Sequence, residues 1–237
     1  MPHAGARPFL SIVSCRIPPL PRRVSGICGV PVSAVGGSVL KELYLLRHGE
    51  TLFNRQHKIQ GWCDSPLTDE GREQARVAGR AFVQAGLDFD TFASSTSERA
   101  SDTLELVMAE LGHAGEPYAR LKGLKEFNHG VFEGEQQYLQ PGLEAFESFF
   151  AQFGGEDART VQLRMAEALD QVMSPSTVGR ALVVSHAGAM FNFLLATGGD
   201  PTVANPMPNC SCMVFTYDGS CAEDLAHRFV FQRVIRP

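Results

Sequence analysis

Short apolar segments that end abruptly in polar residues recur along this sequence, and helical patterns separate them. Glu42–Leu46 and Arg180–Ser185 are continuous apolar runs of the kind found in strands buried on both faces of a parallel sheet. Thr68 stands at a helix N-cap position, because acidic residues follow it and the periodic pattern continues to Gly86. The alternation predicts an α/β fold, a three-layer α/β/α sandwich with a mostly parallel central sheet. We expect strands at 42–46, 91–94, 118–121 and 180–185, helices at 68–86, 97–111, 158–172 and 187–196, and antiparallel or edge strands at 211–217 and 226–234.

Chemically active side chains follow the predicted strands. In open α/β sheets, ligands bind beyond the carboxyl ends of the strands. Arg47 and His48 follow the first strand, Arg99 lies shortly after the second, Glu126 after the third, and His186 directly after the fourth. Two arginines, two histidines and one glutamate are therefore expected to converge at one edge of the sheet.

These residue types suit the transfer of a phosphoryl group. The charge of such a group is spread over three oxygens in the transition state, and arginine offers them a permanently charged fork of donors. Neutral imidazole is a nucleophile for phosphorus, because its unperturbed pKa is about 6.5. Two histidines and a glutamate could also bind a metal ion, but the arginines repel cations. We therefore expect no metal site and no cofactor.

Several sequence blocks, in this order and spacing, resemble the histidine phosphatase superfamily, which has the phosphoglycerate mutase-like fold. The resemblance covers about residues 42–217. A single Arg-His-Gly motif would be weak support, whereas the ordered set is specific. The blocks are Arg47-His48-Gly49, Asn54, Gly61–Leu67, Ser94-Ser95 with Arg99-Ala100, Glu126 with Gly130, Glu133 and Gly134, Ser185-His186-Ala187-Gly188, and Pro208-Asn209-Cys210.

The resemblance implies a metal-independent phosphatase that forms a phosphohistidine on His48. Arg47, Arg99 and His186 would bind the phosphoryl oxygens. Glu126 would act as general acid towards the leaving alkoxide and then as general base towards water. The catalytic set is thus His48, Glu126, His186 and Arg47. The alternatives to Glu126 as proton donor are the nearby Glu50, Glu133 and Glu135.

Further contacts to the phosphate are implied by the same resemblance. Asn54 would supply a neutral donor, and Gly61 and Ala187 belong to the predicted substrate-binding set. Because His186 begins a predicted helix, backbone N–H groups near Ala187 and Gly188 could also bind an anion.

The superfamily contains mutases as well as phosphatases. Mutases of this type tend to have a longer insertion after the loop that carries the acid, whereas about 50 residues separate Glu133 from the strand at Ala181. Mutases also commonly read Glu-Arg-His-Tyr-Gly where this chain has Glu126–Gly130, and Gly-Asn-Ser where it has Ala187–Ala189. We therefore expect a hydrolase. The alternatives are a cofactor-dependent mutase and a non-catalytic protein that binds phosphate esters.

Residues 131–160 are expected to form the variable wall of the substrate site. Their aromatic richness suits an apolar or sugar-like leaving group, but a helix that packs this stripe into the core explains it equally well.

Composition restricts the partners of the chain. A net charge of −5 argues against a nucleic-acid-binding protein. No apolar run approaches the roughly 20 residues of a membrane span. The six cysteines are scattered and form no disulfide framework, which suits a reducing cytoplasm. We expect a cytoplasmic protein whose partner is a small-molecule phosphate monoester, and the sequence does not indicate its oligomeric state.

Residues 1–40 differ in composition from the catalytic domain expected at 41–237. They contain no Asp or Glu, and prolines such as Pro18, Pro19 and Pro21 disfavour a packed helix or central strand. A transit peptide and a secretory signal are possible interpretations. We favour a disordered extension or a mis-assigned start with Val39 as the initiating position, and we expect no catalytic role for this segment.

Overall fold

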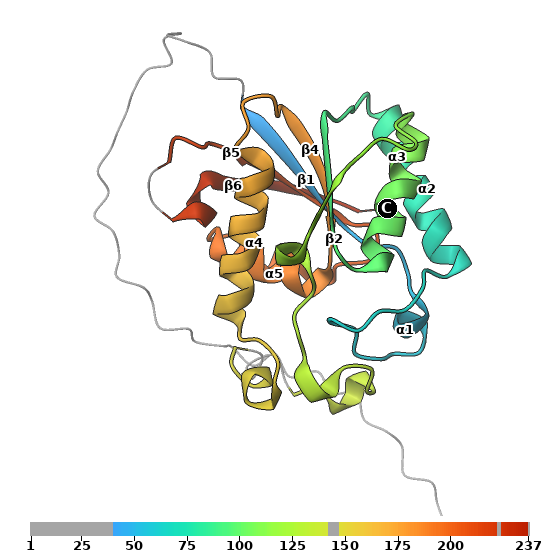
Figure 1. Cartoon of the computed structure of the whole chain (residues 1–237), viewed down its shortest axis with the longest axis vertical. Helices are drawn as coiled ribbons and strands as arrows, with labels where there is room; N and C mark the ends of the chain where they lie inside the picture. Colours follow the sequence, from blue (N-terminus) through green and yellow to red (C-terminus); the bar gives the residue numbers. More distant parts are fainter. Residues whose placement is uncertain (1–39, 142–146, 222–223, 237) are drawn as a thin grey trace, which may run out of the picture. The chain divides into compact units, whose positions relative to one another are not determined.

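The computed structural model describes residues 40–141, 147–221 and 224–236. The predicted extension at 1–40 therefore lies outside the described residues, except for Leu40. Figure 1 shows the described part as a central sheet with helices on both of its faces.

The sheet has six strands in the order β3-β2-β4-β1-β5-β6. The pairs β1–β4, β2–β4 and β2–β3 are parallel, and β1–β5 and β5–β6 are antiparallel. The expectation of a mostly parallel sheet with antiparallel strands at the end of the chain is confirmed. The strands are β1 (Lys41–Arg47), β2 (Thr91–Ser95), β3 (Ala119–Leu121), β4 (Arg180–Ser185), β5 (Cys212–Tyr217) and β6 (Phe229–Ile235).

The side chains of β1 alternate between two hydrophobic layers. Leu43 and Leu45 lie in the core beneath α4 (Ala158–Met173) and α5 (Ala187–Ala196). Tyr44 and Leu46 lie in the opposite core, beneath α2 (Asp69–Gln84) and α3 (Glu98–Leu111). Because successive side chains of a strand point to opposite faces, this continuous apolar run needs a cover on each side. The three-layer α/β/α architecture is confirmed.

Two predictions of local structure were wrong in detail. The last strand was expected from residue 226, but a short 3-10 helix occupies Leu225–Arg228, since the side chain of Asp224 accepts a hydrogen bond from the N–H of Ala226. The four-residue helix α1 (Leu52–Arg55) was not predicted, and Thr51 and Asn54 hold it by a reciprocal capping box. The remaining 3-10 helices among the described residues are η1 (Lys122–Leu124), η2 (Gly130–Phe132), η3 (Gln137–Leu139), η5 (Phe150–Phe153) and η6 (Pro201–Ala204).

The topology brings the carboxyl ends of β1, β2 and β4 to the same edge of the sheet. Arg47 of β1 stands opposite Ser185 of β4. The N–H of His48 donates to the carbonyl of Ser185 at 3.1 Å, so the two polar segments leave the sheet together. Among the described helices, none is long and apolar enough to cross a membrane.

Candidate active site

His48 lies just beyond the end of β1, and its side chain is buried. Its Nδ1 is 2.7 Å from the carbonyl oxygen of Gly49. Because a carbonyl can only accept, Nδ1 carries the proton and donates it in this bond. The lone pair of a neutral His48 therefore resides on Nε2.

The surroundings of His48 favour this neutral form. Burial, followed by the positive charges of Arg99 and Arg47, lowers the pKa of His48 well below its usual 6.5. The ring centroid of His48 is 5.2 Å from that of His186. At neutral pH, His48 thus presents an unprotonated nitrogen within a positively charged environment.

His186 caps the N-terminus of α5 directly after β4 and has no exposed surface. Burial, followed by the charges of Arg99 and His48, lowers its pKa well below 6.5 as well. Neither ring nitrogen of His186 has a hydrogen-bond partner among the described residues, and the same is true of Nε of Arg47 and Nε of Arg99. Buried polar groups are nearly always paired. A ligand with several acceptor oxygens would satisfy these groups together.

Other nitrogen atoms of the Arg99 and Arg47 guanidinium groups donate to the protein itself. Nη1 of Arg99 donates to the carbonyl of Cys63 at 3.0 Å and to the carboxylate of Asp64 at 2.8 Å, and Nη2 donates to the carbonyl of Gly61 at 2.8 Å. Nη1 of Arg47 donates to the carbonyl of Met207. Both guanidinium groups are therefore anchored, and each keeps its Nε unpaired.

Glu126 lies in the loop after η1, and its carboxylate accepts three backbone hydrogen bonds. The donors are the N–H of Phe127 at 2.8 Å, of Gly188 at 2.9 Å and of Ala189 at 2.7 Å. The first turn of α5 thus holds the carboxyl group of Glu126 at the N-terminus of the helix that His186 begins. The N–H of Gly188, which we expected near the phosphate, donates to Glu126 in this structure, and Ala187 opens the helix beside it.

Asn54 is connected to the backbone of His48 through the side chain of Asn209. Its Oδ1 accepts from the N–H of Thr51 and from Nδ2 of Asn209, both at 3.2 Å. Nδ2 of Asn209 also donates to the carbonyl of His48 at 3.0 Å. Because Oδ1 of Asn54 is used twice, its amide nitrogen is the group available to an acceptor.

Gly61 is bound by the protein on both of its backbone groups. Its carbonyl accepts from Arg99, and its N–H donates to Oε2 of Glu133 at 3.0 Å. The loop of Gly61 therefore takes its position from the site arginine and from the segment after Glu126.

Sequence reasoning missed the role of Glu133, which it considered only as an alternative proton donor. The carboxylate accepts from the N–H groups of Gly61, Trp62, Cys63 and His129, at distances between 2.8 and 3.0 Å. Burial raises the pKa of Glu133, but hydrogen bonds from His129 and Cys63 outweigh it and lower the pKa overall. Glu133 thus joins two loops of the site as a fixed carboxylate.

Asp64 was also missed. Ser97 was expected to open α3 but makes no side-chain cap, and Oδ2 of Asp64 accepts from the N–H of Glu98 at 2.5 Å instead. The same carboxylate pairs with Arg99 through Oδ1. One acidic side chain from a distant loop therefore caps the helix and orients its arginine.

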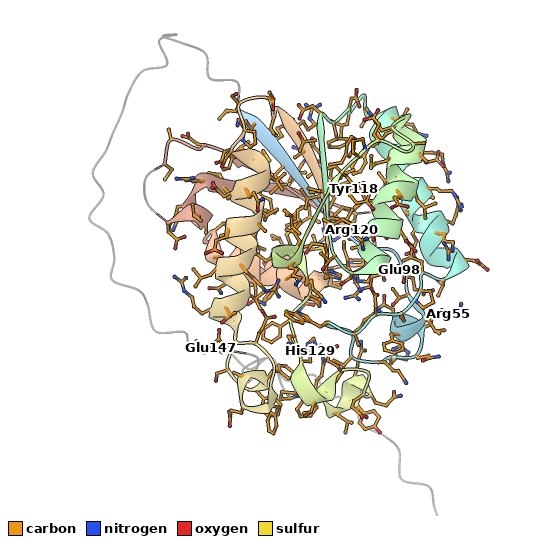
Figure 2. The ribbon with its side chains drawn as sticks, in the orientation of Figure 1. Arg55, Glu98, Tyr118, Arg120, His129 and Glu147 are labelled. Carbon is orange, nitrogen blue, oxygen red and sulfur yellow. The ribbon has the colours of Figure 1, made fainter. Side chains whose placement is uncertain are left out.

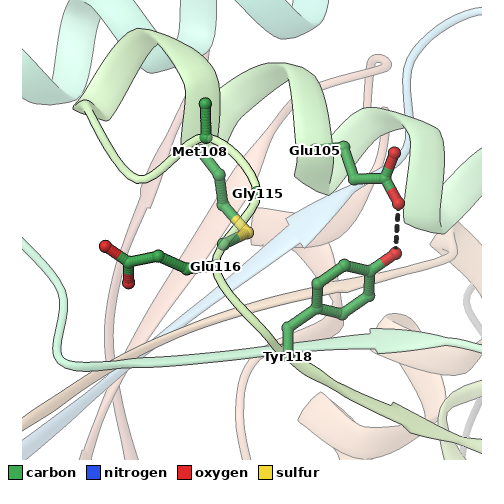
Figure 3. A pocket seen from close by; sticks show the side chains of 6 residues that line it. Glu105, Met108, Gly115, Glu116 and Tyr118 are labelled. Atoms are coloured by element: carbon green, nitrogen blue, oxygen red, sulfur yellow. Dashed lines mark hydrogen bonds between the residues drawn. The ribbon is translucent and has the colours of Figure 1, made fainter.

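Figure 2 labels Glu98 at the start of α3 and, lower in the view, His129. Glu98 is adjacent in sequence to Arg99, and His129 follows Glu126 in its loop. The contacts between the rings of His48 and His186, and from the N–H groups of Gly188 and Ala189 to Glu126, bring the segments after β1, β4 and η1 together. Figure 3 shows a separate pocket, which is lined by residues between Glu105 and Tyr118 and includes none of the predicted site residues. Two of its lining residues are hydrogen-bonded, since the Tyr118 hydroxyl donates to Glu105 at 2.5 Å.

Replacing Glu133 by Gln is expected to lower the free energy of unfolding by about 2–3 kcal/mol. The amide keeps one acceptor oxygen but brings an NH₂ group against backbone N–H donors, which leaves them buried and unpaired. Urea denaturation measures the change. Glu135→Gln is the matched control, because Glu135 is exposed and its change should stay within about 0.5 kcal/mol. Equal stability of the two variants would contradict this role for Glu133.

Below pH 6.5, the two buried histidines are expected to destabilise the protein as the pH falls. The pKa of each is lowered in the folded chain, so protons bind first to the unfolded chain. Each histidine should reduce the free energy of unfolding by up to about 1.4 kcal/mol per pH unit between 6.5 and its lowered pKa. Urea denaturation at about pH 7.5 and about pH 5.5 measures this slope.

His186→Gln should remove about half of that slope. Hydrogen bonds that His113 donates to Asp88 and Glu116 raise the pKa of His113. This surface histidine therefore changes stability in the opposite direction, and it is present in both the parent protein and the variant. The difference between the two slopes therefore isolates His186. Identical slopes would show that His186 is not held neutral.

One protein family matches most of this chain. The family model of the histidine phosphatase superfamily (branch 1) matches residues 43–227. A 2,3-bisphosphoglycerate-dependent phosphoglycerate mutase of Treponema pallidum (strain Nichols) is 33% identical over 162 residues, which are 68% of this chain and 59% of that protein. The chain spans only 40% to 59% of the length of the first curated relatives that it matches.

Solved structures share the fold. A phosphoglycerate mutase from Bacillus anthracis str. Sterne has a TM-score of 0.69 and 23% identity, over 82% of this chain and 92% of that one. A phosphoserine phosphatase from Entamoeba histolytica in complex with 3-phosphoglyceric acid has a TM-score of 0.65 and 24% identity, over 83% of this chain and 98% of that one.

Proposed function

Because the chain belongs to the histidine phosphatase superfamily, we propose that it hydrolyses phosphate monoesters through a phosphohistidine on His48. The observation that carries the proposal is the unprotonated Nε2 of His48, which is buried beside His186 and among the charges of Arg47 and Arg99. A nucleophile in such a place can attack an anionic phosphorus centre without first losing a proton.

The reaction is a double displacement. Nε2 of His48 forms a bond to phosphorus while the ester P–O bond breaks, and Glu126 gives a proton to the leaving alkoxide. Water then attacks phosphorus, its proton returns to Glu126, and the N–P bond breaks to release phosphate. Arg47, Arg99 and His186 stabilise the phosphoryl oxygens through the nitrogen atoms that the protein leaves unpaired. Asn54 and the backbone at Gly61 and Ala187 complete the proposed substrate contacts.

Hydrolysis is proposed in preference to phosphoryl transfer between substrates. The described part of the segment between Glu133 and α4 contains only the short helices η3 and η5, so it offers little to enclose a substrate. A mutase remains the second candidate, because the curated relatives that match are named phosphoglycerate mutases.

The proposed partner is a small-molecule phosphate monoester in the cytoplasm. Exposed apolar side chains occur next to Gly61 and in the segment after Glu126, and they suit a leaving group with an apolar part. They are Trp62, Val131, Tyr138, Leu139 and Phe153.

Phosphate release from a panel of monoesters tests the proposal. The panel contains p-nitrophenyl phosphate, sugar phosphates, nucleotides and 3-phosphoglycerate, each with excess chelator. We expect release that survives the chelator and is absent from a His48→Asn variant. Conversion of 3-phosphoglycerate to its 2-isomer only when a bisphosphoglycerate is added, without release from any ester, would replace the phosphatase by the mutase. The absence of activity in both assays would favour a non-catalytic protein that binds phosphate esters.

A further inference from the structure

Arg164, on the inner side of α4, is hydrogen-bonded through all five of its N–H donors. Nε and Nη2 bind the two carboxylate oxygens of Glu156 at 2.8 and 2.9 Å. Nη1 donates to the carbonyls of Gly123 and Lys125 at 2.9 and 2.6 Å, and Nη2 also donates to the carbonyl of Glu126 at 2.9 Å. A guanidinium group has five donors, so Arg164 has none left for a substrate.

Glu156 extends this contact to the other side of the Glu126 loop. Its Oε2 accepts from the N–H of Asn128 at 2.9 Å, and its own N–H donates to the carbonyl of Asn128 at 2.9 Å. The side chains of Arg164 and Glu156 are only 15% and 11% exposed, so the ion pair is largely shielded from water and salt. The pair therefore holds the chain immediately before and after Glu126.

Both the main-chain carbonyl and the side-chain carboxylate of Glu126 are thus held by hydrogen bonds. Its carbonyl accepts from Arg164 and from Nε1 of Trp62, the latter at 3.0 Å. Its carboxylate accepts from the first turn of α5, at Gly188 and Ala189. A displacement of the main chain at Glu126 would move the carboxylate away from His186, which begins the same helix.

We propose that Arg164, paired with Glu156, is a positioning residue that sets the reach of the Glu126 carboxyl group towards the leaving oxygen. The inference rests on the proposed role of Glu126 as proton donor. Arg164 has no donor free for a substrate, and it acts on Glu126 through the backbone of the Glu126 loop. Besides burial, its charge also lowers the pKa of His186, and lysine would keep that charge. Lysine cannot replace it, because an ammonium group has three donors and lacks the planar fork.

Leaving-group dependence distinguishes positioning from a general structural role. An alkyl phosphate such as glycerol 3-phosphate needs a proton on its leaving oxygen, whereas p-nitrophenolate leaves without one. We expect Arg164→Lys to lower kcat/KM for the alkyl ester about 10- to 100-fold more than kcat/KM for p-nitrophenyl phosphate. The ratio kcat/KM reports the first displacement, in which only the alkyl leaving group needs the proton. Trp62→Phe removes the other donor to the carbonyl of Glu126 and should show a smaller selective loss. It is the second test variant if Arg164→Lys does not fold.

Arg228→Lys is the matched control. Arg228 forms an ion pair at 2.8 Å with Asp170, which lies on α4 as Arg164 does. Arg228 also donates to the backbone carbonyl of Cys221. Neither of these partners lies in the Glu126 loop, so this variant should lower stability without changing the ratio of the two rates. An equal selective loss in Arg228→Lys would overturn the inference.

Glu126→Gln separates failure of the inference from failure of the proposed function. We expect this variant to lose the alkyl ester selectively, and Arg164→Lys to add no further selective loss in the double variant, because both changes act on the same proton transfer. One outcome would overturn the inference alone. In it, Glu126→Gln loses activity selectively with the alkyl ester, but Arg164→Lys either shows no such selectivity or adds its full loss in the double variant. A non-selective Glu126→Gln would remove the proposed acid, and the inference with it.

Discussion

His48→Asn is expected to lower phosphate release by about 10⁴-fold or more while the protein remains folded. Loss of the nucleophile leaves only binding and electrostatic stabilisation, as in other enzymes with a covalent intermediate. Asparagine can still donate its amide N–H towards the carbonyl of Gly49, which is the hydrogen bond that His48 makes here. The rate with p-nitrophenyl phosphate and the urea midpoint measure the two effects.

His113→Asn is the control for the loss of a histidine. His113 pairs with Asp88 and Glu116 and packs against Phe92 near the start of β2, at the other end of the strand from the site. Its replacement should leave the rate unchanged. A His48→Asn variant that keeps a tenth of the activity would contradict a nucleophilic role.

Arg99→Met is expected to damage activity and stability together. Arg99 is fully buried, and its removal strips a charge from the phosphoryl site, for which we expect a loss of about 10³-fold in kcat/KM. The same change leaves Asp64 and the carbonyls of Gly61 and Cys63 without their donor. Because Asp64 is exposed and water can solvate it, the cost comes mainly from the two unpaired carbonyls, and we expect a loss of about 2–3 kcal/mol of the free energy of unfolding.

Arg80→Met is the control for Arg99→Met. Arg80 pairs with Glu73 and Glu110 on the exposed faces of α2 and α3, where an ion pair contributes little. Its loss should change stability by no more than about 0.5 kcal/mol and activity not at all. If Arg99→Met kept its stability, the Gly61–Asp64 loop could not depend on this side chain as described.

The strand ends and the residues that follow them could be predicted from the sequence. Arg47, His48 and His186 are adjacent in the chain to apolar strands, so their positions follow from local pattern and from the parallel topology. Thr68 likewise caps α2 as its sequence context indicates, with its hydroxyl accepting from the N–H of Gly71 at 2.9 Å.

The contacts between loops could not be predicted in this way. Asp64 caps a helix that begins 34 residues later, and Glu133 binds backbone groups about 70 residues earlier. Arg164 holds the carbonyl of Glu126 across 38 residues. The periodicity of the sequence does not predict such contacts. A carboxylate that binds another loop and a carboxylate that faces solvent occur in the same local sequence pattern. A glutamate between Gly130 and Gly134, both at positive φ, was the one local sign of a tight turn near Glu133.

Trapping of the covalent intermediate tests the central claim most directly. The protein is mixed with a ³²P-labelled monoester, quenched in alkali, in which phosphohistidine survives, and digested for peptide mapping. We predict label on the peptide that contains His48, formed and lost at rates that match turnover, and no label in His48→Asn. Full turnover with an unlabelled protein, or label on another residue, would contradict a phosphohistidine on His48.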